Sequence, residues 1–538
     1  MKRLSEMATF FYFKHSIYIN YQSMNWLSEI KIRLPSRIQR FISLLLILVL
    51  INSPLHILAK ESGYYVKLTP KLQRAYFEIQ KLKIQSARDL INEERSANTG
   101  NGFVQYLDNY ADLHYLLISE DKTAYKKLLE AEDERLSQLD ELPDSSPYKK
   151  LFQAEIRIHW AFAKIKFGNE MSGSWDIIKA YRLLDQNHQK FPAFIPNLKS
   201  LGLLHILIGS VPENYTWVTK ILGLKGNIKL GVQEIETVIR DEPFFRQEAQ
   251  LIDLLMHAYT LQLSDFQLEK LKQLPKDQPD NLLLHFFATT ILMKEGNSKE
   301  ASWYLSHAPS GPDYIAFPFL NYLKGEIALQ QGKYESAISW YLLFQKNYKG
   351  FNYIKDSNLK LFMCKWLDNR GAEANIYLQR IEKTGSAIIE ADKLAQRTAD
   401  EYLAGKINTQ QKILYRSRYA TDGGYLEEAL KILDPFSEKS FSSLPDKAEF
   451  NYRKGRILQK SDLVDRSVPF FERAVLLTKN SSIGFGASAA LQLGYVFKDK
   501  GQKQKAINYF KAAILYKKYE YKNSIDNKAK AALSELGE

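Results

Sequence analysis

Residues 318–350 read PFLNYLKGEIALQQGKYESAISWYLLFQKNYKG. Apolar and small residues recur there at helical spacing, which is typical of helices that bury one face. Gly325 lies on the first predicted helix, Gly332 lies in a turn, and Ala337 and Tyr341 lie on the second. Small residues let two crossing helices approach closely, and an aromatic ring fills the space beside them. The stretch therefore predicts two antiparallel helices joined by a glycine turn.

The same unit recurs along the C-terminal half of the chain. Its key small position falls at Thr289, Gly325, Cys364, Ser417, Gly455 and Gly494, at intervals of 36, 39, 53, 38 and 39 residues. The 53-residue interval contains residues 381–405, which predict an additional helix. Residues 523–538 are polar on one side and predict a capping helix, which repeat arrays need at their ends.

This unit resembles the tetratricopeptide repeat, whose period is about 34 residues. The resemblance implies an all-α fold, in which residues 247–538 form a superhelical array of helical hairpins. Residues 60–240 show the repeat less clearly and predict an N-terminal helical domain. Its predicted helices span about 70–96, 102–119, 121–140, 148–168 and 172–188.

The resemblance also implies a concave groove lined by the first helix of each hairpin. The groove positions carried over from the family are Phe319, Tyr322, Glu326, Tyr452, Arg456, Lys460, Tyr495 and Lys498. Aromatic and basic side chains together suit an extended peptide or an acidic C-terminus. The alternative is that these are ordinary half-exposed helix residues.

A glycine-rich motif occupies residues 201–235, which read LGLLHILIGSVPENYTWVTKILGLKGNIKLGVQEI. Its marked positions are Gly209, Pro212, Trp217, Gly223, Gly226 and Gly231. The segment resembles the inclusion-body clearance and tetratricopeptide-repeat-39 proteins, and exported repeat proteins of the Bacteroidota type. We interpret it as a helix-hairpin corner held by glycines and an aromatic residue. The alternative is an apolar pocket or membrane-touching elbow formed by Val211, Trp217, Ile221 and Leu222.

The N-terminal 59 residues predict a signal peptide or a membrane anchor. Residues 41–59 contain no charged side chain, and four basic residues lie within the preceding ten positions. A short apolar run after a basic region is typical of a cleaved export signal. Such signals are about 15–30 residues long, so Met24 is a candidate for the true start. Uncleaved, residues 41–59 would associate with a membrane. We therefore expect a periplasmic or envelope location.

Charge and composition exclude several classes of protein. The 538 residues carry a net charge of +13, of which residues 1–59 supply +5. The net charge of +8 on the remaining residues is small for their number, which argues against nucleic acid as a partner. A single cysteine, Cys364, excludes a disulfide framework and is expected in the core.

The sequence shows no catalytic motif, no metal-ligand spacing and no cofactor-binding fingerprint. The acidic run Glu130–Glu134 could pair carboxylates for glycoside hydrolysis, but it is expected to be a solvated helix face. The sequence thus predicts a non-catalytic scaffold or adaptor that binds other envelope proteins. A module for lipid or apolar ligands is the alternative, and a helical-barrel enzyme acting on glycans is a remote one.

Overall fold

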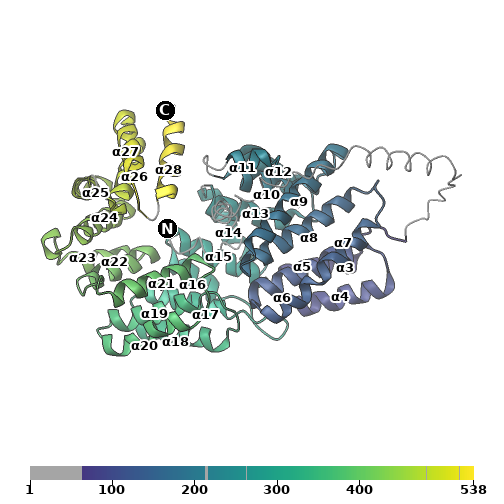
Figure 1. Ribbon diagram of the computed structural model, residues 1–538, viewed down its shortest axis with the longest axis horizontal. Helices are drawn as coiled ribbons and strands as arrows, with labels where there is room; N and C mark the ends of the chain where they lie inside the picture. The colour runs from purple at the N-terminus through teal and green to yellow at the C-terminus, as the bar shows by residue number, and fades with distance from the viewer. Residues whose placement is uncertain (1–62, 212–215, 262, 480, 520–521) are drawn as a thin grey trace, which may run out of the picture. The chain divides into compact units, whose positions relative to one another are not determined.

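The computed structural model describes residues 63–211, 216–261, 263–479, 481–519 and 522–538 (Figure 1). These residues are almost entirely helical, and within them the β-structure is one isolated bridge between Tyr65 and Asn101. The predicted all-α fold is confirmed. No helix in the described ranges is long and apolar enough to cross a membrane. The predicted leader, with Met24, lies outside the described residues.

The chain divides into two compact units. The N-terminal unit runs through Leu117 and from Lys122 to Gln262, whereas residues Ile118–Asp121 group with the C-terminal unit, which continues from Leu263. The helices of the N-terminal unit are α3 (Pro70–Gln80), α4 (Ile84–Ala97), α5 (Gly102–Ser119), α6 (Lys122–Leu129), α7 (Ala131–Asp140), α8 (Pro147–Lys166), α9 (Glu170–Lys190), α10 (Asn197–Gly209), α11 (Thr216–Ile221), α12 (Ile228–Asp241) and α13 (Arg246–Tyr259).

Two predicted helices of this unit are each divided in the structure. The helix expected over 70–96 is broken between α3 and α4, where Leu82 adopts a left-handed φ of 65°. The helix expected over 121–140 is broken at Glu130, between α6 and α7. Periodicity does not locate such breaks, because the apolar face continues across them.

The N-terminal unit buries ionic networks between its helices. Lys199 of α10 is almost completely buried, and its Nζ atom lies 2.9 Å from Glu155 of α8 and 2.8 Å from Glu248 of α13. The hydroxyl of Tyr76 donates a second hydrogen bond to Glu248, at 2.7 Å. Each buried charge therefore has a partner, which the cost of desolvation requires.

The glycine-rich motif forms the crossing of α10 and α12. A Cβ atom on Gly226 would lie 2.2 Å from the backbone nitrogen of Gly209, and one on Gly231 would lie 2.5 Å from the carbonyl oxygen of Gly202. Gly223 adopts a left-handed φ of 72° in the turn before α12. Gly209, Gly226 and Gly231 therefore lie at this crossing, together with Gly202, which the sequence interpretation missed. Pro212 and the side chain of Trp217 lie outside the described residues.

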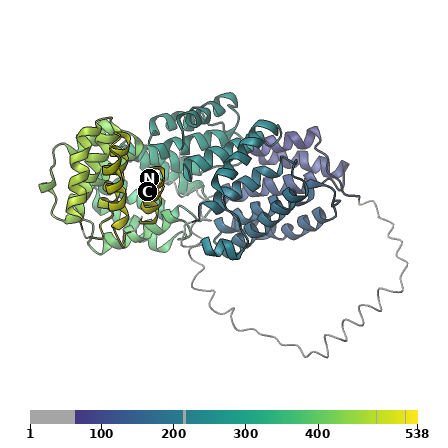
Figure 2. The same ribbon diagram turned by 90° about the horizontal axis from the view of Figure 1, so that it is seen from above.

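The C-terminal unit contains the repeat array. Its elements are α14 (Asp265–Asp277), α15 (Leu282–Glu295), α16 (Ser298–Ser306), α17 (Phe319–Gln330), α18 (Tyr334–Asn347), α19 (Ile354–Leu367), α20 (Gly371–Lys383), α21 (Glu390–Leu403), α22 (Gln411–Gly423), α23 (Leu426–Leu433), the 3-10 turn η3 (Glu438–Ser440), α24 (Leu444–Lys460), α25 (Val464–Leu477), α26 (Gly484–Asp499), α27 (Lys503–Leu515) and α28 (Lys522–Glu535). The hairpins α24/α25 and α26/α27 lie side by side in both views (Figures 1 and 2).

Each strong repeat unit packs an aromatic ring directly on its key glycine. A Cβ atom on Gly325 would lie 2.7 Å from the ring of Tyr341, and one on Gly494 would lie 2.4 Å from Phe510. The key positions of the weaker units, Thr289, Cys364 and Ser417, are all fully buried. The predicted hairpins are therefore confirmed at all six positions.

The array folds back on itself after the predicted additional helix, which is α21. Helix α21 packs on α19, so the following hairpin does not continue in the direction of the preceding ones. Its first helix, α22, contacts α15 and α17. The turns that end α15 and α22 meet at two glycines with left-handed φ, Gly296 and Gly424. A Cβ atom on Gly424 would lie 1.9 Å from the carbonyl oxygen of Gly296, so this contact requires glycine.

We expect Gly226→Ala to destabilise the N-terminal unit by about 2 kcal/mol or more, because its methyl group would meet backbone that cannot move aside. Gly223→Ala is the comparison, since its Cβ atom has open space and it suffers only a left-handed backbone cost of about 1–2 kcal/mol. Hydrogen exchange of the α10 amides measures both changes. Equal losses of protection would contradict the crossing.

Gly494→Ala should destabilise the last hairpin by about 1–3 kcal/mol, because Phe510 must leave its position. The matched control is Gly371→Ala at the start of α20, where a Cβ atom meets nothing within 4 Å. That change should be neutral or slightly stabilising. Chemical denaturation followed by far-ultraviolet circular dichroism tests the pair, and similar midpoints for both variants would refute the packing.

Candidate functional site

The C-terminal unit contains a cavity of about 810 Å³. Residues of α15, α17, α22, α24, α26 and α28 line it, together with Tyr353 just before α19. Six of the eight predicted groove residues lie in this lining: Phe319, Tyr322, Glu326, Tyr452, Arg456 and Lys460. The structure thus brings together side chains from repeats more than a hundred residues apart.

One wall of the cavity is aromatic. The rings of Phe319 and Tyr322 stack with centroids 4.9 Å apart, and the ring of Tyr353 lies 4.6 Å from that of Phe319. On α24, the ring of Tyr452 lies 5.8 Å from that of Phe485. Such fixed rings offer apolar contact area with little loss of side-chain freedom.

A network of buried charged side chains contacts the residues of this aromatic wall. The hydroxyl of Tyr322 donates to Asp356 at 2.5 Å, and that of Tyr341 donates to Glu326 at 2.5 Å. Lys360 lies 3.4 Å from both carboxylates. Glu326 therefore lines the cavity, but its carboxylate is engaged inside the protein, which the sequence interpretation did not anticipate.

Asp392 of α21 holds Tyr353, the residue of the aromatic wall that directly precedes α19. Its two carboxylate oxygens accept the backbone N–H groups of Tyr353 at 2.7 Å and of Asp356 at 2.9 Å. Tyr353 has a left-handed φ of 62°, which costs energy for a residue with a side chain. Burial raises the pKa of the Asp392 carboxyl to about 8, against the opposing effect of the hydrogen bond from Asp356.

Most charges of the cavity form ion pairs within the protein. Lys294 pairs with Glu295 at 2.7 Å, Arg418 lies 3.6 Å from Asp422, and Arg453 binds Glu449. Arg456 and Lys460 differ, because among the described residues neither has a carboxylate within ion-pair distance. The Nη1 atom of Arg456 instead donates to the neutral amide oxygens of Gln459, at 2.5 Å, and Gln492, at 2.6 Å.

The remaining predicted groove residues, Tyr495 and Lys498, are not among the lining residues. Lys498 forms an ion pair with Glu535 of α28, and Tyr495 packs on Phe510 at 5.3 Å and against the core that α28 completes. The capping helix thus covers the groove positions of the last repeat. Its own residues Ile525 and Lys528 line the cavity.

Other lining residues that sequence reasoning missed come from the fold-back. Tyr415, Arg418 and Asp422 lie on α22, and Lys294 and Glu295 end α15. The groove positions of these weaker repeats could have been carried over in the same way as for the strong ones. That these residues meet across the cavity could not be predicted in this way, because it depends on the direction that the chain takes after α21.

The N-terminal unit has a cavity of its own, of about 910 Å³. There, Lys164 lies 2.6 Å from Glu132 and 2.7 Å from Asp176. The prediction that the acidic run Glu130–Glu134 is a solvated face is therefore wrong for Glu132, which is buried. Burial also raises the pKa of Glu132, although Lys164 opposes this shift. Lys164 thus forms ion pairs with both carboxylates.

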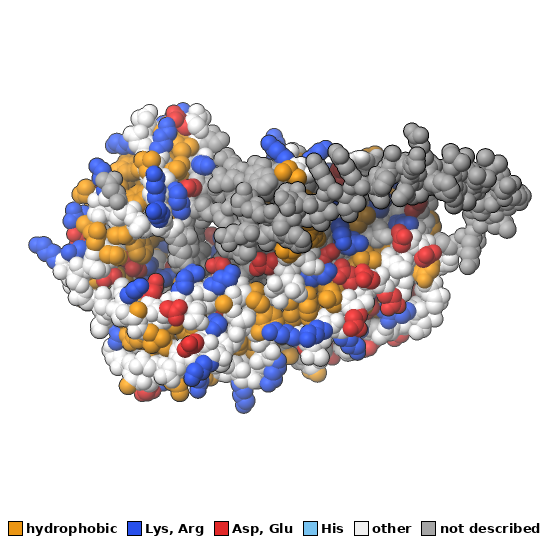
Figure 3. Space-filling view, in the orientation of Figure 1, with side chains coloured by type: hydrophobic (Ala, Val, Ile, Leu, Met, Phe, Trp, Pro, Cys, Tyr) orange, Lys and Arg blue, Asp and Glu red, His pale blue; other side chains and the backbone are white. Residues whose placement is uncertain are grey.

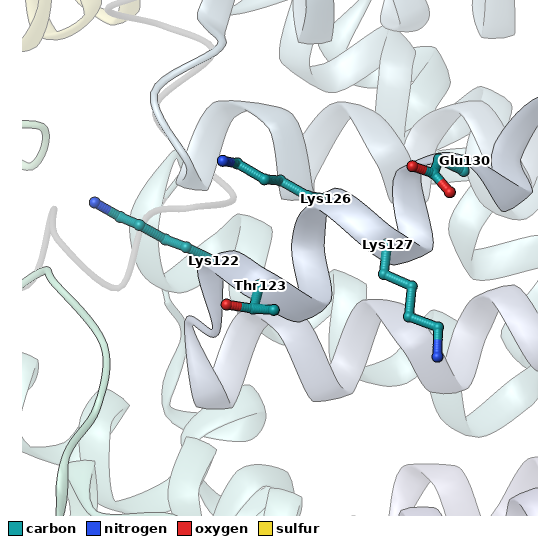
Figure 4. Close-up of a pocket in the computed structure, with 5 residues that line it drawn as sticks. All are labelled: Lys122, Thr123, Lys126, Lys127 and Glu130. Carbon is teal, nitrogen blue, oxygen red and sulfur yellow. The ribbon is translucent and has the colours of Figure 1, made fainter.

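Other features of the N-terminal unit are less organised. Figure 4 shows a depression on α6 lined by Lys122, Thr123, Lys126, Lys127 and Glu130, whose exposed side chains extend in different directions. Figure 3 shows basic and acidic side chains interspersed over the visible face. Within the described ranges, no group of three or more His, Cys, Asp or Glu residues could hold a metal ion.

The apolar-pocket hypothesis for residues 211–222 stays a prediction. Val211 is buried and Ile221 is 75% exposed, so these two side chains occupy different environments. The nearby His205 is buried, and its Nδ1 atom lies 2.6 Å from the carboxylate of Glu234. Cys364 is fully buried, as expected for a residue of the core.

Comparison with known proteins identifies one repeat directly. Residues 487–519, which cover most of α26 and α27, match the family model described as "Tetratricopeptide repeat". No curated protein matches the chain. Among solved structures, the chain is similar to one in "Crystal structure of APC/C hetero-tetramer Cut9-Hcn1", with 12% identity, a TM-score of 0.24, and coverage of 88% of this chain and 97% of that one.

We expect Asp392→Asn to remove part of the pH dependence of stability. An unfolded aspartate titrates near 3.9, so between about pH 4 and pH 8 the folded chain keeps a proton that the unfolded chain releases. Wild-type stability should therefore fall as the pH rises through that range, and the variant should gain relative to it. Thermal unfolding between about pH 5 and pH 9 measures this. The exposed Asp499→Asn is the control, and a pH-independent difference between Asp392→Asn and wild type would contradict the assignment.

Proposed function

We propose that the protein is a non-catalytic scaffold or adaptor that holds a segment of a partner protein in the cavity of its C-terminal unit. The observation that carries the proposal is the convergence of Phe319, Tyr322, Tyr452 and Arg456 on one cavity. Buried aromatic rings and arginine are the residue types that dominate binding energy at protein interfaces. The tetratricopeptide repeat at residues 487–519 supports the same class of function.

The size of the cavity also supports a peptide segment. Ligand-binding clefts commonly enclose about 300–1,000 Å³, and the cavity holds about 810 Å³. Its lining combines aromatic rings with charged and amide side chains, which suits a chain that has both apolar and polar groups.

We further propose that the protein acts in the cell envelope after export through its N-terminal leader. The support is the basic region followed by the apolar run at residues 41–59. N-terminal sequencing of the mature protein tests this, and an N-terminus upstream of residue 41 would contradict cleavage.

Site-specific photo-crosslinking in the native cells tests the scaffold function. A benzophenone amino acid at Tyr452 should give a covalent adduct with one reproducible partner, because that position lines the cavity. The matched control is the same amino acid at Leu476 of α25, which is 62% exposed and is not among the lining residues. No protein adduct at Tyr452, or the same adducts from both positions, would contradict the proposal. Lipid bound in native mass spectrometry instead would favour the apolar-ligand alternative.

A further inference from the structure

Two basic side chains of the cavity, Arg456 and Lys460, form no ion pair with any carboxylate in the described part of the chain. Of the basic lining residues on α15, α22 and α24, three form ion pairs with Glu295, Asp422 and Glu449. Arg456 and Lys460 have no such partner among the described residues. The polar contacts of Arg456 are two glutamine oxygens, which bind the guanidinium but carry no charge.

These two charges also repel each other. Arg456 and Lys460 lie one helical turn apart on α24, where like charges are destabilising. Lys460 is only partly exposed, and its Nζ atom is 2.7 Å from where a Cβ atom on Gly296 would be. Burial and then the Arg456 charge lower the pKa of Lys460, while the charges of Asp422 and Glu295 oppose this. An anion between the two side chains would relieve both costs.

We infer that the bound segment carries an aspartate or glutamate whose carboxylate is received by Arg456 and Lys460. The inference rests on the proposed function and names the chemical class of the segment. A carboxylate can accept hydrogen bonds from both cations at once, and charge-assisted hydrogen bonds are about twice as strong as neutral ones.

The rest of the cavity favours a peptide over a free inorganic anion. Phe319, Tyr322 and Tyr353 form an aromatic wall that a phosphate or sulfate ion would leave unfilled. A segment with an apolar residue near its acidic one would fill this wall and reach the cations on α24. The sequence left open an extended peptide or an acidic C-terminus, and the two unpaired cations select an acidic group in either case.

The test uses the full chain and a fluorescein-labelled library of random hexapeptides with amidated C-termini. Amidation leaves acidic side chains as the source of carboxylates. Sequences that bind are resynthesised with each Asp changed to Asn and each Glu to Gln. We expect one acidic position at which the neutral copy binds at least about tenfold more weakly.

Variants of the protein locate the carboxylate. Arg456→Gln and Lys460→Met should each weaken binding of the acidic peptide by about tenfold and leave binding of its neutral copy unchanged. Arg418→Gln is the matched control, because it removes one positive charge from the same cavity but from a residue already close to Asp422. It should change affinity by less than about threefold. Circular dichroism confirms that each variant is folded.

The outcomes separate the inference from the proposed function. If peptides bind but their neutral copies bind equally well, the acidic class is wrong and the scaffold function stands. If Arg418→Gln weakens binding as much as Arg456→Gln, the effect is long-range and the assigned site is wrong. If no peptide binds the folded chain, both proposals fail.

A second readout is the titration of Lys460 itself, followed by NMR of lysine side chains and assigned with Lys460→Met. A bound carboxylate should raise the pKa of Lys460, because a nearby negative charge favours the protonated amine. No change in its titration on binding of the acidic peptide would overturn the inference.

Discussion

The cavity of the C-terminal unit depends on one backbone contact, between the glycine turns at Gly296 and Gly424. Both residues have left-handed φ angles, and a Cβ atom on Gly424 would lie 1.9 Å from the carbonyl oxygen of Gly296. This approach lets α22 pack against α15 and α17. Because α22 also packs on α24, this contact brings the cavity-lining residues of α15 and α17 to the same cavity as those of α24.

The additional helix α21 makes that contact possible and also stabilises the wall. It lies between α20 and α22 in the chain and packs on α19, and α22 then contacts α15, α17 and α19. Its Asp392 accepts the backbone N–H groups of Tyr353 and Asp356, which fixes the start of α19. Asp356 in turn accepts the hydroxyl proton of Tyr322, which lines the cavity. A chain of hydrogen bonds therefore connects the irregular step of the sequence to the candidate binding surface.

The local units could be predicted from the sequence because their signals are local. Gly325, Gly455 and Gly494 meet aromatic rings 16 residues later on the partner helix of the same hairpin, a spacing that a short pattern reveals. The additional helix and the capping helix were also predicted, from one long interval and from a polar helical stretch. The eight groove positions followed from the family resemblance, and six of them line the cavity.

What could not be predicted depends on contacts between distant segments. The ion pair between Lys498 and Glu535 forms because α28 packs on α26, and no spacing of residues in the sequence predicts it. The engagement of Glu326 by Tyr341 and Lys360, and the burial of Glu132 against Lys164, likewise require three-dimensional neighbours. The sequence pattern of an acidic residue on a predicted helix is the same whether a lysine from another helix or water contacts its carboxylate.

The distance between the turns at Gly296 and Gly424 can be measured in solution. Spin labels on cysteines introduced at Lys299 of α16 and Glu427 of α23 would report it by pulsed electron paramagnetic resonance. Both positions are exposed, each lies three residues beyond its glycine, and the native Cys364 is fully buried. We expect one narrow, short distance in the wild type and a longer, broader distribution in Gly424→Val. A long or broad distribution in the wild type would contradict the contact between the two glycine turns.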